Sequence, residues 1–156
     1  MNLQLYSDEL FSIQIDRYEL GNDVEAAPPK KIVSCSISDQ NQFAVAICDE
    51  VGRLIGFFGL HIGEQPEIYG KTDGSYALIK EMSIDVRHRG KGYATQCFEQ
   101  IFEFINDEIS EDITCLVLSV NEKNFLAQRV YEKADFKKRN DLTQGLVIME
   151  KRKRMG

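Results

Sequence analysis

The spacing of apolar residues changes along the chain, and each spacing predicts an element. Residues 113–120 are a nearly continuous apolar run, which is typical of a strand buried on both faces, and the strand-like run over 76–86 predicts the central strand. A turn-linked pair over 43–48 and 54–61 predicts a hairpin, and 3–6 a short first strand. Helical spacing predicts helices over 94–109 and 124–134, before a final antiparallel pair at 136–138 and 145–151. This order predicts an α/β fold with a mixed sheet of about six or seven strands.

The first third of the chain gives weaker signals. Ser7 and the two acids after it predict a helix that stops at Gly21, with four residues on its buried side: Leu10, Phe11, Ile13 and Tyr18. Residues 30–42 fit either a short helix or irregular structure. Residues 62–75 read as a mobile loop, and Gly56 and Gly59 suggest a bulge or a close backbone approach.

A basic, glycine-rich turn joins the strand over 76–86 to the helix that follows it. Gly90 and Gly92 let the backbone approach a ligand, and the first amides of a helix have no partner inside it. The helix dipole adds positive potential, and Arg87, Arg89 and Lys91 add positive charge. We therefore expect this turn to bind a phosphate or pyrophosphate.

Two common phosphate-binding motifs do not match this turn. The P-loop pattern Gly-x-x-x-x-Gly-Lys-Ser/Thr is absent, and Thr95 stands where a dinucleotide site requires a third glycine. The turn instead fits Arg/Gln-x-x-Gly-x-Gly/Ala, as Arg89, Gly92 and Ala94. In this motif the chain resembles the GNAT superfamily of acetyl-coenzyme A-dependent N-acyltransferases. A basic loop that only caps a helix is the alternative interpretation.

A second segment supports the resemblance. Residues 120–136 are similar to the family pattern Asn-x-x-Ala-x-x-x-Tyr-Glu-Lys-x-Gly-Phe. Asn124, Ala127 and Tyr131 have the spacing of residues on one helix face. Asp135 departs from the pattern, because the family usually has glycine there; we expect the same turn with some strain.

The resemblance implies a fold and a cofactor site. It implies a GNAT-like mixed sheet with helices on both faces, whose two central parallel strands splay apart to admit acetyl-coenzyme A as cosubstrate. Met82, Ser83 and Ile84 would lie opposite the pantetheine, and a backbone N–H of this segment would stabilise the thioester oxygen. The pyrophosphate would lie among seven residues: Arg89, Gly90, Lys91, Gly92, Tyr93, Ala94 and Thr95.

The same resemblance assigns the catalytic groups. Tyr131 occupies the position of the general acid, and a phenol can deliver a proton to a departing thiolate. Asn124 would orient the ligand or a water. Glu81 adjoins the pantetheine segment, and strand alternation would put it on the same face as Ser83. It is the candidate base, with a water chain as the alternative and Asp85 as a weaker candidate.

Composition bounds the remaining functions. The net charge of −6 argues against a nucleic-acid partner and suits a cationic amine. No apolar run is long enough to span a membrane and no signal peptide is evident, so we expect a cytoplasmic protein with one domain over 1–156. The spacing of four cysteines and two histidines makes a metal site improbable, so none is expected.

Two functions stay open at this point. The first is an N-acetyltransferase that transfers the acetyl group directly to a primary amine in a ternary complex. The second is a catalytically silent module on the same fold that binds or senses coenzyme A. Retention of Asn124 and Tyr131 favours the enzyme. The sequence does not decide between a small-molecule and a protein amine, and it leaves a homodimer possible.

Overall fold

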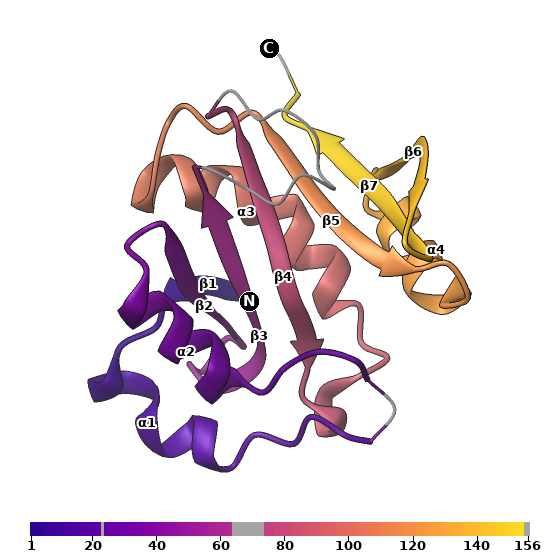
Figure 1. The fold of residues 1–156 in the computed structure, drawn as a ribbon. Coiled ribbons are helices and arrows are strands. Elements are labelled where there is room, and N and C mark those ends of the chain that lie inside the picture. The colour runs from indigo at the N-terminus through magenta and orange to yellow at the C-terminus, as the bar shows by residue number, and fades with distance from the viewer. Residues whose placement is uncertain (23, 64–73, 155–156) are drawn as a thin grey trace.

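One mixed sheet of seven strands crosses the whole molecule (Figure 1). The computed structural model describes residues 1–22, 24–63 and 74–154. The strands follow the order β1-β2-β3-β4-β5-β7-β6, with β4 and β5 parallel at the centre and antiparallel neighbours on either side. They are β1 (Asn2–Leu5), β2 (Gln42–Cys48), β3 (Leu54–Ile62), β4 (Tyr76–Ile84), β5 (Cys115–Asn121), β6 (Lys137–Thr143) and β7 (Leu146–Arg152). The predicted strand number and mixed pairing are confirmed.

Helices cover both faces of this sheet. The short helices α1 (Asp8–Asp16) and α2 (Pro29–Ser38) lie on one face, and α3 (Tyr93–Glu108) and α4 (Phe125–Lys133) lie on the other (Figure 1). Neighbouring residues of β3 show how both faces are filled. Phe57 packs in the core under α1 and α2, whereas Phe58 packs in the larger core under α3. Burial on both faces explains why β3 reads as a continuous apolar run.

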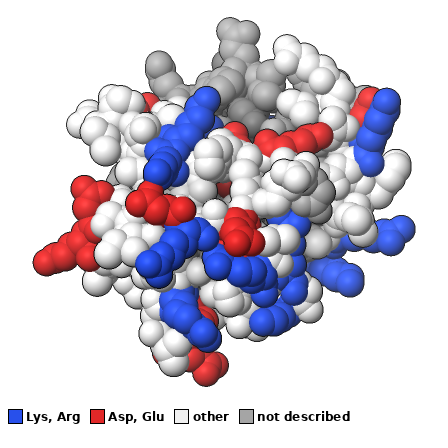
Figure 2. Space-filling model, turned by 90° about the horizontal axis from the view of Figure 1, so that it is seen from below, with Lys and Arg blue, Asp and Glu red and all other residues white. Residues whose placement is uncertain are grey.

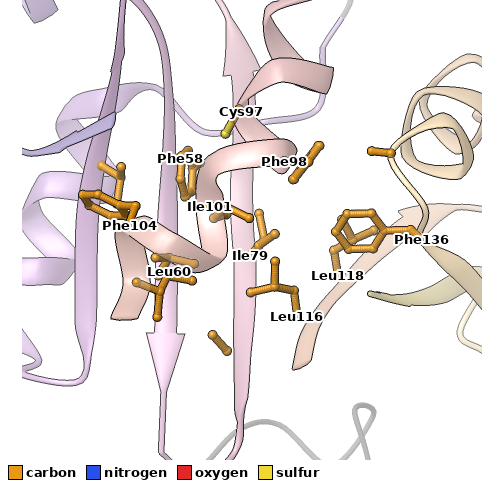
Figure 3. Close-up of a cluster of buried hydrophobic side chains, with 14 of the residues drawn as sticks. Phe58, Leu60, Ile79, Cys97, Phe98, Ile101, Phe104, Leu116, Leu118 and Phe136 are labelled. Atoms are coloured by element: carbon orange, nitrogen blue, oxygen red, sulfur yellow. The ribbon is translucent and has the colours of Figure 1, made fainter. Parts of the chain in front are cut away.

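The larger core joins α3 to the central strands (Figure 3). Phe98, Ile101 and Ile105 of α3 are at most 1% exposed. They belong to one cluster with Ile79 of β4 and Phe136, which follows α4. This core fixes α3 against the sheet, so the N-terminus of α3 has a set position relative to the end of β4.

The N-terminal helices correct part of the prediction. Ser7 caps α1 as expected, and its Oγ accepts a hydrogen bond from the N–H of Leu10 at 3.3 Å. However, the side chains of Leu10 and Ile13 are 59% and 67% exposed, and α1 ends at Asp16 instead of Gly21. Each residue turns a helix by about 100°, so Leu10 and Ile13 point away from the face that buries Phe11.

The ambiguous stretch after Pro28 is helical. α2 begins at Pro29, a position where proline fits because the first amide of a helix needs no partner, and it buries Ile32 and Val33. The expected loop over 62–75 falls mostly on residues 64–73, which lie outside the described residues. Within the described part of the chain, no helix is long and apolar enough to cross a membrane.

The two central strands separate partway along their length. β4 and β5 pair from Tyr76 with Cys115 to Leu78 with Val117, and their pairing ends there although both strands continue. This confirms the splay that the family resemblance implied. β5 keeps its antiparallel pairing with β7 along its full length, so a gap opens in the middle of the sheet.

Candidate active site

The gap between β4 and β5 is a groove made of two joined cavities. The first, of about 370 Å³, lies between residues 79–82 of β4 and 118–121 of β5. The second, of about 330 Å³, extends from Met82 past the glycine turn to the start of α3. Four residues line both cavities: Val24, Met82, Ala127 and Tyr131. The groove therefore runs without a break from the open sheet to the N-terminus of α3.

The glycine turn has the backbone geometry of an anion site. Gly90 and Gly92 adopt positive φ angles of 75° and 80°, which favour glycine. Gly92 is the N-cap of α3, and its carbonyl accepts the N–H of Gln96 at 3.1 Å. Tyr93, Ala94 and Thr95 follow Gly92 and line the second cavity. Their amides precede the first hydrogen bond of the helix and therefore have no partner inside it.

The basic side chains of the turn have other partners. Arg87 pairs with Asp85 at 2.7 Å, and Arg89 donates to the carbonyls of Ile84 and Leu20. Lys91 lines a separate cavity beside Asp49. The groove therefore contains six of the seven residues predicted around the pyrophosphate, and Lys91 is the exception. Figure 2 views the molecule from the end at which the glycine turn lies, and on this face Lys and Arg side chains are interspersed with Asp and Glu.

A bulge interrupts β4 next to the groove. The register with β3 shifts between Phe57 and Gly59, and Glu81 adopts a positive φ of 56°. Ile79 and Met82 are three residues apart, yet both pack against the α3 core. An extra residue thus reverses the facing of the strand between Ile79 and Met82. Glu81 and Ser83 nevertheless both face the side covered by α1 and α2, as expected, since their side chains contact Ala27 and Tyr18.

The carboxylate of Glu81 lies on the wall of the first cavity. Its Oε2 accepts a hydrogen bond from the N–H of Ala27, just before α2. The side chain is exposed, and a carboxylate has more than one acceptor position. Glu81 can thus hold the segment before α2 and still accept a proton from a bound amine.

Asp85 has a structural role instead of the weak catalytic role expected from sequence. It is fully buried and accepts hydrogen bonds from the side chain and amide of Arg87 and from the amide of Glu19. Burial opposes its ionisation, but these hydrogen bonds outweigh burial and lower the pKa of Asp85 to about 2. It is a fixed anion and is not among the residues that line the two cavities.

Asp85 belongs to a set of contacts that we call the clamp, between residues 17–20 and 83–89. Tyr18 and Ser83 share a hydrogen bond of 2.7 Å between their hydroxyls. The amide of Val86 donates to the carbonyl of Glu19 at 2.8 Å, and Arg87 and Arg89 reach the carbonyls of Arg17 and Leu20. The clamp anchors the chain that continues into the groove wall.

Tyr131 lies where the two cavities meet. Its ring packs edge-on against Phe98 and Phe136, with centroids 5.8 and 5.7 Å away. No hydrogen bond joins its hydroxyl to any residue of the described chain. Burial raises the pKa of Tyr131 to about 12, so the phenol keeps its proton at neutral pH.

Asn124 caps α4, and its role is therefore partly structural. Its side-chain oxygen accepts the N–H of Ala127 at 3.1 Å, which leaves the amide nitrogen to face a ligand. Asn124, Ala127 and Tyr131 all line the first cavity, as their spacing predicted. Asp135 has a φ of 71°, which confirms the left-handed turn after α4.

Sequence reasoning missed one wall of the groove. Residues Val24, Glu25 and Ala26 line the first cavity, and Val24 also lines the second. These residues match no motif, and they reach the groove only because the clamp holds residues 17–20 against the end of β4.

Known proteins resemble the chain in sequence and in fold. The model of the acetyltransferase (GNAT) family matches residues 7–136. A curated relative, the "Uncharacterized N-acetyltransferase YbbJ" of Bacillus subtilis (strain 168), is 26% identical over 144 residues, covering 87% of this chain and 84% of the relative.

Solved structures share the fold at lower identity. One is aminoglycoside acetyltransferase AAC(6')-Ib with coenzyme A and kanamycin, at a TM-score of 0.75 and 18% identity over 97% of this chain and 94% of that one. Another is spermidine N-acetyltransferase from Vibrio cholerae with CoA and spermine, at a TM-score of 0.65 and 18% identity over 97% and 95%. The chain belongs to the acetyltransferase (GNAT) family, as its two motifs predicted, and is an acetyltransferase.

Proposed function

We propose that this chain transfers an acetyl group from acetyl-coenzyme A directly to a primary amine, with both substrates bound in the groove. The pyrophosphate would lie on the amides that begin α3, and the pantetheine along the open edge of β4. The thioester would then lie near Met82, where the two cavities join. The related structures with bound coenzyme A and amines support this arrangement.

The reaction requires one bond to form and one to break. The amine nitrogen attacks the thioester carbonyl carbon, and the carbonyl oxygen gains negative charge that a free backbone N–H of β4 would stabilise. The carbon–sulfur bond then breaks, and the electron pair leaves on the thiolate. The amine loses a proton to Glu81, directly or through a water, and the thiolate gains a proton from Tyr131.

The position of Tyr131 is the observation that carries this mechanism. Its hydroxyl has no hydrogen-bond partner in the described chain, and the residue lies where the first cavity meets the second. A pKa near 12 keeps it protonated in the resting enzyme. A general acid needs this state, because it must still hold its proton when the thiolate forms.

Replacing Tyr131 with phenylalanine tests the proposal. Tyr131→Phe removes the proton and little volume, so we expect kcat to fall by about 10²–10⁴-fold. The dissociation constant of coenzyme A should change little, because the lost interaction forms in the transition state. Thiol release over a panel of amines and calorimetry with coenzyme A would measure the two quantities.

A second tyrosine provides the control. Tyr6 donates to Asp8 at 2.7 Å and lines neither cavity of the groove, so Tyr6→Phe should keep normal turnover. Turnover of Tyr131→Phe within about threefold of wild type, with chemistry limiting the rate, would remove Tyr131 from the mechanism. Tight coenzyme A binding without thiol release for any amine would instead indicate the silent binding module.

A further inference from the structure

A third cavity lies behind the bulge of β4, on the side of the sheet covered by α2. Its volume is about 70 Å³, roughly twice the share of one water molecule in the liquid. Ile32, Phe43 and Gly59 form apolar walls. A Cβ at Gly59 would approach Ile32 to 3.2 Å, so the missing side chain helps to keep this space open.

This cavity adjoins the first cavity of the groove. Lys80 and Glu81 line both of them, and the hydrogen bond from Ala27 to Glu81 crosses the boundary. A group bound in the small cavity would therefore lie beside an amine held by Glu81. Its size suits a carboxylate and the carbon that carries it.

Two cationic side chains accompany the Glu81 carboxylate in the lining of the small cavity. Lys31 of α2 and Lys80 of β4 both line the small cavity. Among the described residues, neither ammonium has a carboxylate within ion-pair distance, whereas their neighbour Lys30 pairs with Asp16 at 2.7 Å. Lys80 makes a long contact of 3.5 Å to Gln42, whose amide nitrogen in turn donates to Asp39.

Opposite charges are thus arranged side by side. Glu25 lines only the first cavity and Lys31 only the small one, whereas Glu81 and Lys80 lie at the boundary and line both. An amine with a second positive charge would place it near Lys80, where like charges repel. An acceptor with a negative charge near its amine would place the amine beside Glu81 and the negative charge beside Lys80.

We propose that the small cavity binds an anionic group of the acceptor. The acceptor is then an amphoteric small molecule such as an amino acid or an aminophosphonate, with its amine on Glu81 and its anion on Lys80 and Lys31. This inference rests on the proposed acetyl transfer and specifies its substrate class.

Matched acceptors test the inference with the full-length protein. Each L-amino acid of a panel is compared with its carboxamide, its aminophosphonate counterpart and the amine that lacks the carboxyl group. Thiol release from acetyl-coenzyme A gives kcat/KM for each. We expect the acid or the phosphonate to exceed the neutral amide and the simple amine by about tenfold to a hundredfold, as for a hydrogen bond to a charged group. The anion that gives the higher kcat/KM, carboxylate or phosphonate, identifies the anionic group that the small cavity prefers.

Variants of the lysines locate the effect. Lys80→Met should bring the ratio of acid to simple amine to within about threefold, and Lys31→Met should lower it less because Lys31 is more exposed. Lys30→Met is the matched control, since Lys30 points to Asp16, and it should keep the wild-type ratio. Equal turnover of acids, amides and simple amines by wild type would overturn the inference. A ratio that survives both Lys80→Met and Lys31→Met would overturn it as well.

A binding measurement separates this inference from the proposed activity. Calorimetry of the same acceptors on protein saturated with coenzyme A needs no turnover. If thiol release is absent throughout, the proposed activity fails, yet amino-acid binding that weakens tenfold in Lys80→Met would still support the anionic subsite. Acids that bind no better than their simple amines would refute it.

Discussion

The two walls of the groove are built in different ways. The wall that we propose for the cofactor, here called the cofactor wall, consists of the glycine turn, the start of α3 and one face of α4, all parts of regular elements that short motifs specify. The wall that we propose for the acceptor, the acceptor wall, consists of residues 24–26, the bulge at Glu81 and the side of α2, which long-range contacts hold in place. Backbone amides dominate the first wall and charged side chains the second. The first suits an invariant ligand, and the second suits a variable one.

The largest difference between the walls should appear in the anion site. Gly92→Asp puts a side chain at a φ of 80° and a negative charge beside the amides of α3. We expect coenzyme A affinity to fall about tenfold to a hundredfold, as when a hydrogen bond to a charged group is lost. Calorimetry would measure it.

Gly52→Asp controls for backbone strain. Gly52 has a φ of 85° and, like Gly92, open space where a Cβ would lie, but it sits in the turn between β2 and β3. It should lose a similar amount of stability and keep coenzyme A affinity. Equal affinities for the two variants would show that the turn at Gly92 does not hold the phosphates.

The next effect concerns the clamp behind the acceptor wall. The pKa of Asp85 is lower in the folded chain, so its ionisation stabilises the fold above its ordinary pKa near 3.8. That stability is lost as pH falls from about 4 through 2. We expect Asp85→Asn to lose about 2 kcal/mol of unfolding free energy at neutral pH. The loss should shrink at pH 2 to 3, as measured by urea denaturation.

Asp49 offers a matched carboxylate for that experiment. It accepts two backbone amides and pairs with Arg53 at 2.7 Å in the turn after β2, away from the clamp. Asp49→Asn should lower stability without changing the KM of an amine, whereas Asp85→Asn should also raise that KM. If both variants leave KM unchanged, the clamp does not position the acceptor wall.

The smallest effect should come from the acceptor wall itself. Glu81→Gln keeps an oxygen that can accept the amide of Ala27 but removes the charge. We expect kcat/KM for amines to fall about tenfold at most, since an anionic partner of the amine is lost but a water chain can still accept its proton. Coenzyme A affinity should stay within about twofold. Full activity at every pH would assign proton removal to water alone.

The sequence predicted the cofactor wall better than the acceptor wall, for a physical reason. Gly90 and Gly92 indicate a backbone conformation with positive φ, which other residues disfavour. Tyr131 follows Asn124 at a fixed helical spacing. No residue type signals the bulge at Glu81, because glutamate does not favour the positive φ that it adopts there. The directions of Arg89 and Lys91 depend on Leu20 and on the β2–β3 turn, which are distant in sequence.

The early termination of pairing between β4 and β5 also bears on self-association. An unpaired strand edge is usually a hazard, because another chain can add to it and begin an aggregate. Here the open edge lies in the middle of the sheet, and β5, α4 and residues 24–26 wall it on the other sides. A thin, flexible ligand with amide groups suits an edge enclosed in this way, whereas a second polypeptide strand would have to displace the walls in order to pair with it.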